Sequence, residues 1–179
     1  MVETESFAQQ LTKKLDQATN AAQNDQAGAA IKLFEEIIKE EIPSTDEIND
    51  EVIRCKELST YKLAAIFKEK GLIEELVNLT KSILPLFVNF PKSKLAKIIR
   101  TLFDLTMKIE GRYQELVGLC EHIIKWCEDE NRSFLRMRIE TNLAELNFKL
   151  MKYNDAIIIL NKLTYELKKK EDKQLLVES

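Results

Sequence analysis

The residues best suited to metal or nucleophilic chemistry are Cys120, His122 and Cys127, which stand close together in the sequence. Zinc needs about four ligands that converge on one point, and a cysteine nucleophile needs a base within hydrogen-bond reach. On a helix, residues seven apart share a face, whereas His122 lies roughly 200° around the helix from Cys120. The spacing therefore predicts two buried cysteines and a surface histidine, with no metal site and no catalytic site.

Other sequence signs of catalysis or cofactor binding are missing. The sequence contains no phosphate-binding loop, no glycine-rich dinucleotide motif and no H-E-x-x-H metal motif. The adjacent carboxylates Glu35–Glu36 and Glu40–Glu41 fit the solvated face of a helix. We therefore expect a protein that is not an enzyme and that uses no cofactor.

Composition narrows the structural class. Gly (4) and Pro (3) are scarce among 179 residues, whereas a sheet protein of this size needs many turns, so helices with short connections are favoured.

The net charge of −3 does not favour binding to nucleic acid. The longest apolar stretches, such as residues 156–160, are too short to span a membrane. Three cysteines, an odd number, favour a reducing compartment.

An internal repeat of about 40 residues organises the chain. Similar segments begin at Gly71, Gly111 and Met151, which are 40 residues apart, and an earlier copy begins at Asp25. The sixth and seventh positions of each copy are apolar: Ala30–Ile31, Leu76–Val77, Leu116–Val117 and Ala156–Ile157. Such spacing places apolar side chains on one helix face. The pattern predicts an all-α fold, a right-handed, tetratricopeptide-like α-solenoid of antiparallel helix pairs.

Capping and turn residues set the expected helix boundaries. Ser44–Glu47 offers an N-cap before a helix, and Pro85 predicts a kink or break. Gly71 and Gly111 stand where a tight turn needs a positive φ. The helix at 132–150 has an apolar face that includes Phe134 and Phe148. The expected helices cover residues 4–23, 26–41, 46–70, 72–89, 92–110, 112–129, 132–150 and 153–171.

Charge is unevenly distributed along the chain. Residues 1–51 contain 12 acidic and 4 basic residues, a net charge of −8, and the remainder carries +5. This asymmetry could steer a protein partner, although solvated helix faces produce the same pattern. The first helix also has an apolar stripe that could dock a partner. The predicted partner-binding residues lie on these first helices: Phe7, Leu11, Lys14, Glu35 and Glu36.

Several segments together resemble a known family. They are Arg132–Glu140 followed by Leu143, Phe148, Tyr153 and Ala156, then Glu166–Glu178, together with Lys94–Leu105 and Cys120–Trp126. These residues resemble the PCI-family lid subunits of the 26S proteasome regulatory particle. The resemblance covers nearly the whole chain from about Phe7 and is strongest from Arg132 onward.

The resemblance implies a helical-repeat arm that is followed by a winged-helix PCI module and a C-terminal helix. Residues 1–179 would then be a single α-solenoid domain, the N-terminal part of a longer protein, with the PCI module absent. The chain stops at an apolar Leu175–Val177, whereas solenoid ends normally carry a polar cap, which fits this expectation. The implied partners are other lid subunits, the ATPase ring and the α-ring of the 20S core, in the cytoplasm and nucleus.

Two other functions stay open. Other PCI assemblies, the signalosome and the translation initiation factor complex, share the architecture. A tetratricopeptide-like peptide-binding adaptor is the second alternative, and it would present polar residues at one recurring repeat position. The equivalent positions here hold Lys32, Asn78, Gly118 and Ile158, which form no such ladder.

Overall fold

The computed structural model describes residues 6–24, 26–43 and 49–177, with side chains described as far as Lys170. Over these residues the chain forms α-helices and no β-strand, which confirms the all-α prediction. The chain divides into two compact units, Met1–Thr106 and Met107–Ser179. The single domain expected over residues 1–179 stays a prediction.

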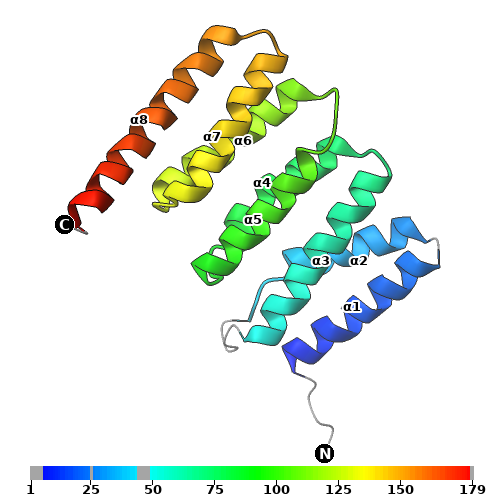
Figure 1. The fold of residues 1–179 in the computed structure, drawn as a ribbon. Coiled ribbons are helices and arrows are strands. Elements are labelled where there is room, and N and C mark those ends of the chain that lie inside the picture. The colour runs from blue at the N-terminus through cyan, green and yellow to red at the C-terminus, as the bar shows by residue number, and fades with distance from the viewer. Residues whose placement is uncertain (1–5, 25, 44–48, 178–179) are drawn as a thin grey trace, which may run out of the picture. The chain divides into compact units, whose positions relative to one another are not determined.

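The first unit is built around a central helix. It contains α1 (Phe7–Gln23), α2 (Ala27–Lys39), α3 (Asp50–Glu69), α4 (Ile73–Leu86) and α5 (Lys92–Thr106). Helix α3 packs against each of the other four, and α1 also packs against α2 (Figure 1). Consequently α3 is buried on several sides, and its sequence mixes apolar residues with the buried polar residues Lys56, Ser59 and Thr60.

Large apolar side chains fill this unit. Phe34 of α2, Leu63 of α3 and Phe103 of α5 are fully buried, and burial of each contributes about 1.5–3 kcal/mol of transfer free energy. After α4, the rings of Phe87 and Phe90 stack with their centroids 4.3 Å apart. Because these side chains come from four segments, the core fixes the arrangement of the helices within the unit.

The second unit consists of three helices. They are α6 (Tyr113–Asp129), α7 (Ser133–Lys149) and α8 (Tyr153–Val177). Helix α7 lies between α6 and α8 and runs antiparallel to both (Figure 1). An ionic network joins α7 to α8: the Arg136 guanidinium donates to both carboxylate oxygens of Glu140, at 2.9 and 2.8 Å, and also to Glu166. Lys162 of α8 donates to Glu140 at 2.9 Å.

Left-handed residues and backbone hydrogen bonds close the turns between helices. At Gly71, Asn131 and Met151 the chain turns with φ of +67°, +54° and +62°. Each time, the next amide donates to a carbonyl five residues back, as Leu72 does to Phe67 at 2.8 Å, which closes a Schellman motif. Gly111 also has a positive φ, of +88°. The predicted left-handed conformation of both glycines is therefore confirmed.

Helix ends differ from the sequence-based boundaries where a specific residue intervenes. Helix α3 begins at Asp50 rather than 46, because the Asn49 side chain accepts the Val52 amide at 2.8 Å. The predicted cap, Ser44–Glu47, lies outside the described residues. Helix α4 ends one residue after Pro85 rather than at 89, which agrees with the break expected there.

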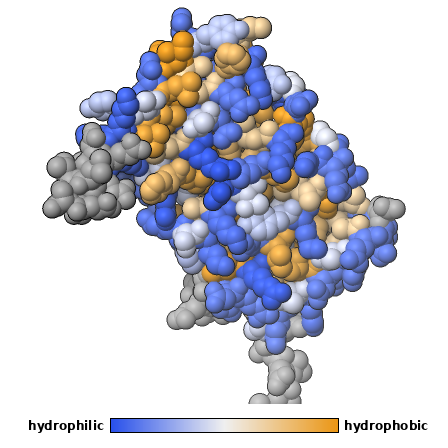
Figure 2. Space-filling model, viewed as in Figure 1, coloured by the Kyte–Doolittle hydropathy of each residue, from blue (hydrophilic) through white to orange (hydrophobic). Residues whose placement is uncertain are grey.

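Three aromatic and aliphatic residues that were expected to face inward are exposed. Phe134, Phe148 and Ile157 are 83%, 62% and 54% exposed, so that part of the predicted packing is wrong. Each has only partial cover from the neighbouring helix: the Lys170 ammonium of α8 lies 4.8 Å from the centroid of the Phe134 ring, and the Phe148 and Tyr153 rings meet edge to face with their centroids 5.3 Å apart. Apolar residues gather over this helix pair in Figure 2. The predicted burial of Ala30, Leu76–Val77, Leu116–Val117 and Ala156 is confirmed.

Met151 provides a test of the turn geometry. A left-handed conformation costs a residue with a Cβ about 1–2 kcal/mol, and Met151 is 73% exposed, so little packing is lost on truncation. We expect Met151→Gly to raise the free energy of unfolding by about 1 kcal/mol, measured by urea denaturation. Asn131→Gly is the matched control and should gain less, because asparagine tolerates this conformation. If Asn131→Gly gained as much stability as Met151→Gly, or if Met151→Gly lost stability, the strain assigned to Met151 would be wrong.

Candidate partner-binding surface

A buried lysine fixes the helices that carry the predicted partner-binding residues. The ammonium of Lys56, on α3, donates to the carbonyls of Ile37, Ile38 and Glu40 at 2.9, 3.0 and 2.6 Å. These carbonyls lie at the C-terminal end of α2, where a helix leaves its last carbonyls without intrahelical donors. A cation also suits the negative end of the helix dipole. Lys56 thereby caps α2 and holds it against α3.

The surroundings of Lys56 are unusually dry for a lysine. Its side chain is 3% exposed, and the ammonium lies 5.9 Å from the centroid of the Phe87 ring. Burial lowers the pKa of Lys56 from 10.5 to about 8, and the nearby Glu40 carboxylate opposes part of this shift. The burial of Lys56 differs from what its residue type predicts. Its position along α3 does indicate burial, because Lys56 falls on the same helix face as the buried Val52 and Leu63.

The first helices enclose a shallow charged hollow of about 460 Å³. It is lined by Lys14 of α1 and, from α2 and the residue after it, Lys32, Glu35, Glu36, Lys39 and Glu40. The Lys14 ammonium donates to both Glu40 carboxylate oxygens, at 2.9 and 2.7 Å. Lys39 pairs with Glu35 at 2.9 Å. These two ion pairs hold four of the six charged groups in a defined arrangement.

The five predicted partner-binding residues are not equivalent in the structure. Lys14, Glu35 and Glu36 come together in the charged hollow, and Glu36 is exposed. Phe7 is half-buried at the start of α1. Leu11 is fully buried, so its side chain belongs to the core and is not offered to a partner. The expected apolar stripe of α1 is thus used inside the unit, because α2 and α3 cover it.

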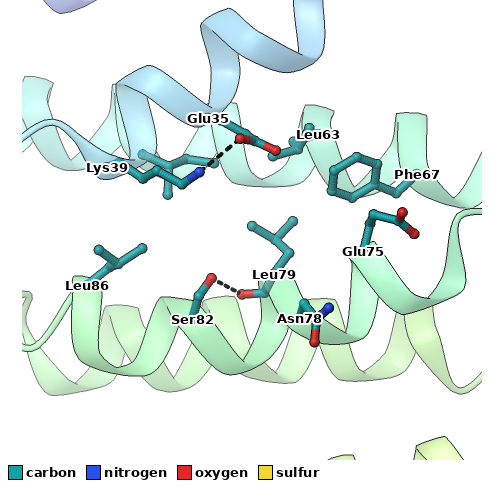
Figure 3. Close-up of a pocket in the computed structure, with 10 residues that line it drawn as sticks. Glu35, Lys39, Leu63, Phe67, Glu75, Asn78, Leu79, Ser82 and Leu86 are labelled. Carbon is teal, nitrogen blue, oxygen red and sulfur yellow. Dashed lines mark hydrogen bonds and ion pairs between the residues drawn. The ribbon is translucent and has the colours of Figure 1, made fainter. Parts of the chain in front are cut away.

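A second hollow shares one wall with the first. Glu35 and Lys39 line both, and α3 and α4 supply the rest of the second, which measures about 270 Å³ (Figure 3). Leu63 and Phe67 form its floor, and side chains of α4 face them across the gap. The Glu35–Lys39 ion pair therefore separates a charged hollow from an apolar one.

The cysteines and the histidine lie where the spacing predicted. Cys120 and Cys127 are buried and His122 is exposed. Burial raises the pKa of the Cys120 thiol to about 12 and that of Cys127 to about 11, so both stay protonated at neutral pH. A protonated, buried thiol is a poor nucleophile and a poor metal ligand. Among the described residues, no group of three or more His, Cys, Asp or Glu could hold a metal ion.

Comparison with known proteins assigns the family. The family model for the 26S proteasome regulatory subunit RPN6 N-terminal domain matches residues 11–150. The chain belongs to this family. The match runs from within α1 to just past α7, so it includes the charged hollow, the Lys56 cap and most of the second unit.

Individual relatives agree with this assignment. The chain is 33% identical over 167 residues to the "Probable 26S proteasome regulatory subunit rpn6" of Schizosaccharomyces pombe, which is 92% of this chain and 38% of that protein. It is 36% identical over 128 residues to the "26S proteasome non-ATPase regulatory subunit 11 homolog" of Arabidopsis thaliana, 72% of this chain and 30% of that protein. The chain thus spans about a third of the length of these relatives.

The names of the relatives indicate regulatory rather than ATPase subunits. The names of these relatives describe regulatory proteasome subunits, one of them explicitly non-ATPase. In the described part of the chain, no helix combines the length and the apolar character required to cross a membrane.

The Lys56 cap predicts a large effect of a single substitution. Lys56→Met keeps a side chain of similar length but leaves two buried carbonyls and one part-buried carbonyl without their donor. We expect a loss of about 3 kcal/mol in the free energy of unfolding, measured by urea denaturation. Lys62→Met, on the same helix and half-buried, is the control and should change stability by less than about 0.5 kcal/mol. Equal effects of the two substitutions would disprove the cap.

The same lysine predicts a pH dependence of defined sign. Its pKa is about 8 in the folded chain, against 10.5 for an ordinary lysine, so between these values the unfolded chain binds more protons. The contribution of Lys56 to the free energy of unfolding should therefore rise with pH in this window. The stability difference between the wild-type chain and Lys56→Met should grow by about 1–2 kcal/mol from about pH 7.5 to 9.5. A constant or shrinking difference would contradict the burial of a charged ammonium.

Proposed function

We propose that this chain is a non-catalytic structural part of the 26S proteasome regulatory particle in ubiquitin-dependent protein degradation. The observation that supports this most strongly is the family match over residues 11–150. The buried, protonated cysteines offer no nucleophile, which agrees with a structural role. As a proteasome subunit it would work in the cytoplasm and nucleus.

We further propose that its helices form a right-handed, tetratricopeptide-like α-solenoid of antiparallel pairs. Support comes from the left-handed turns at Gly71, Gly111 and Met151, which fall 40 residues apart at the same repeat position. Stacked pairs of this kind offer long surfaces for several partners at once. Such an arm would bridge other lid subunits, the ATPase ring and the α-ring of the 20S core.

The surface proposed for the core particle is the charged hollow of α1 and α2. Two ion pairs, Lys14–Glu40 and Lys39–Glu35, hold four of its charged groups, and Glu36 is exposed to solvent. The hollow therefore offers charges of both signs, and these two pairs of charges have fixed positions. Fixed charges at an interface favour rapid and specific association that weakens with salt. The other PCI assemblies remain the alternative, and the relatives named above support the proteasome over them.

Capture by purified particles tests this function. Immobilised chain is mixed with 20S core particles or with free ATPase ring at about 50 and about 300 mM salt. We expect salt-sensitive capture of the core, reduced at least tenfold by the double change Glu35→Lys and Glu36→Lys. The control, Glu121→Lys with Glu128→Lys, makes the same charge change at exposed positions of α6 and should leave capture unchanged. If a chain shown to be helical captures neither particle, the bridging role fails.

A further inference from the structure

We infer that the hollow between α2, α3 and α4 is a binding site for a short peptide in which a bulky apolar residue is followed by a basic residue. This site goes beyond the proposed function and does not depend on it. The hollow measures about 270 Å³, slightly below the volume of pockets that hold whole small ligands. It therefore suits one large side chain.

The floor of the hollow is apolar and rigid. Leu63 and Phe67 of α3 are almost completely buried, and Leu79 of α4 points into the gap from the opposite side (Figure 3). Leu86, which is 41% exposed, closes one end. Because packing already fixes the buried Leu63, Phe67 and Leu79, an apolar group can bind without first ordering the floor of the site.

The rim provides polar groups that a peptide could use. In the described part of the chain, the carboxylate of Glu75 has no ion-pair partner, in contrast to Glu35 across the gap, which Lys39 neutralises at 2.9 Å. The uncompensated charge at this rim is therefore negative, and it complements a basic residue beside the apolar one. The exposed carboxamide of Asn78 can both donate to and accept from a peptide backbone.

The repeat positions explain why the peptide should be short. The positions equivalent to Asn78 hold Lys32, Gly118 and Ile158, so no second carboxamide continues the contact along the chain. Recognition then depends on one apolar anchor, one carboxamide and one charge. Glu75 also lies in the first turn of α4, where a negative charge stabilises the helix, so folding of each variant must be checked.

Fluorescence polarisation with defined peptides tests the site. The probe is a fluorescein-labelled hexapeptide with a central phenylalanine followed by lysine. The two comparison peptides replace the phenylalanine by alanine or the lysine by glutamate. We expect the probe to bind with a dissociation constant below about 1 mM, and each replacement to weaken binding about tenfold. Absence of binding at that concentration, or no effect of the alanine replacement, would overturn the proposal.

A charge exchange separates specific recognition from general adhesion. Glu75→Lys should weaken binding of the lysine peptide and strengthen binding of the glutamate peptide, while Asn78→Ala should weaken both. Glu121→Lys, at an exposed position of α6, is the matched control and should change neither. In NMR spectra, the methyl groups of Leu79 and Leu86 should shift on addition of the probe. A lysine preference that survives Glu75→Lys, or shifts confined to α8, would place the binding elsewhere and overturn the site.

Discussion

The first unit depends on the way the C-terminal end of α2 is satisfied. A helix that ends inside a protein leaves carbonyls that must find donors, and here a single lysine from another helix serves three of them. The Glu40 backbone accepts from Lys56, while its carboxylate accepts from Lys14. One residue thus joins α1, α2 and α3, and the Phe87 ring beside Lys56 extends the contact to the end of α4.

The position of α2 determines both hollows of the first unit. Glu35 and Lys39, one turn apart, contribute to a charged hollow with α1 and to an apolar hollow with α3 and α4. Any movement of α2 would change the two together. Burying the Lys56 ammonium costs desolvation free energy, but it fixes α2, which lines both hollows. A solvent-exposed cap would leave α2 freer to shift.

Local rules in the sequence predicted the helices and turns, because each depends on residues a few positions apart. Gly71 and Gly111 adopt the left-handed conformation, and α4 ends beside Pro85 as expected. Local rules do not predict the buried capping role of Lys56, because a lysine is normally exposed and its acceptors lie 16–19 residues earlier in the chain. The predicted burial of Phe134 and Phe148 is wrong for the converse reason: an apolar face is buried only where a neighbour covers it. Leu11 was read as surface although α1 is covered by two helices.

We propose that α1 and α2 form the surface through which this chain meets the 20S core. Hydrogen–deuterium exchange of the chain, alone and with saturating core particles, tests it most directly, because it locates the protected amides without altering the protein. We expect slower exchange in peptides covering Lys14 and Glu35–Lys39, with little change in α8. Protection confined to α8, with unchanged exchange in α1 and α2, would contradict it.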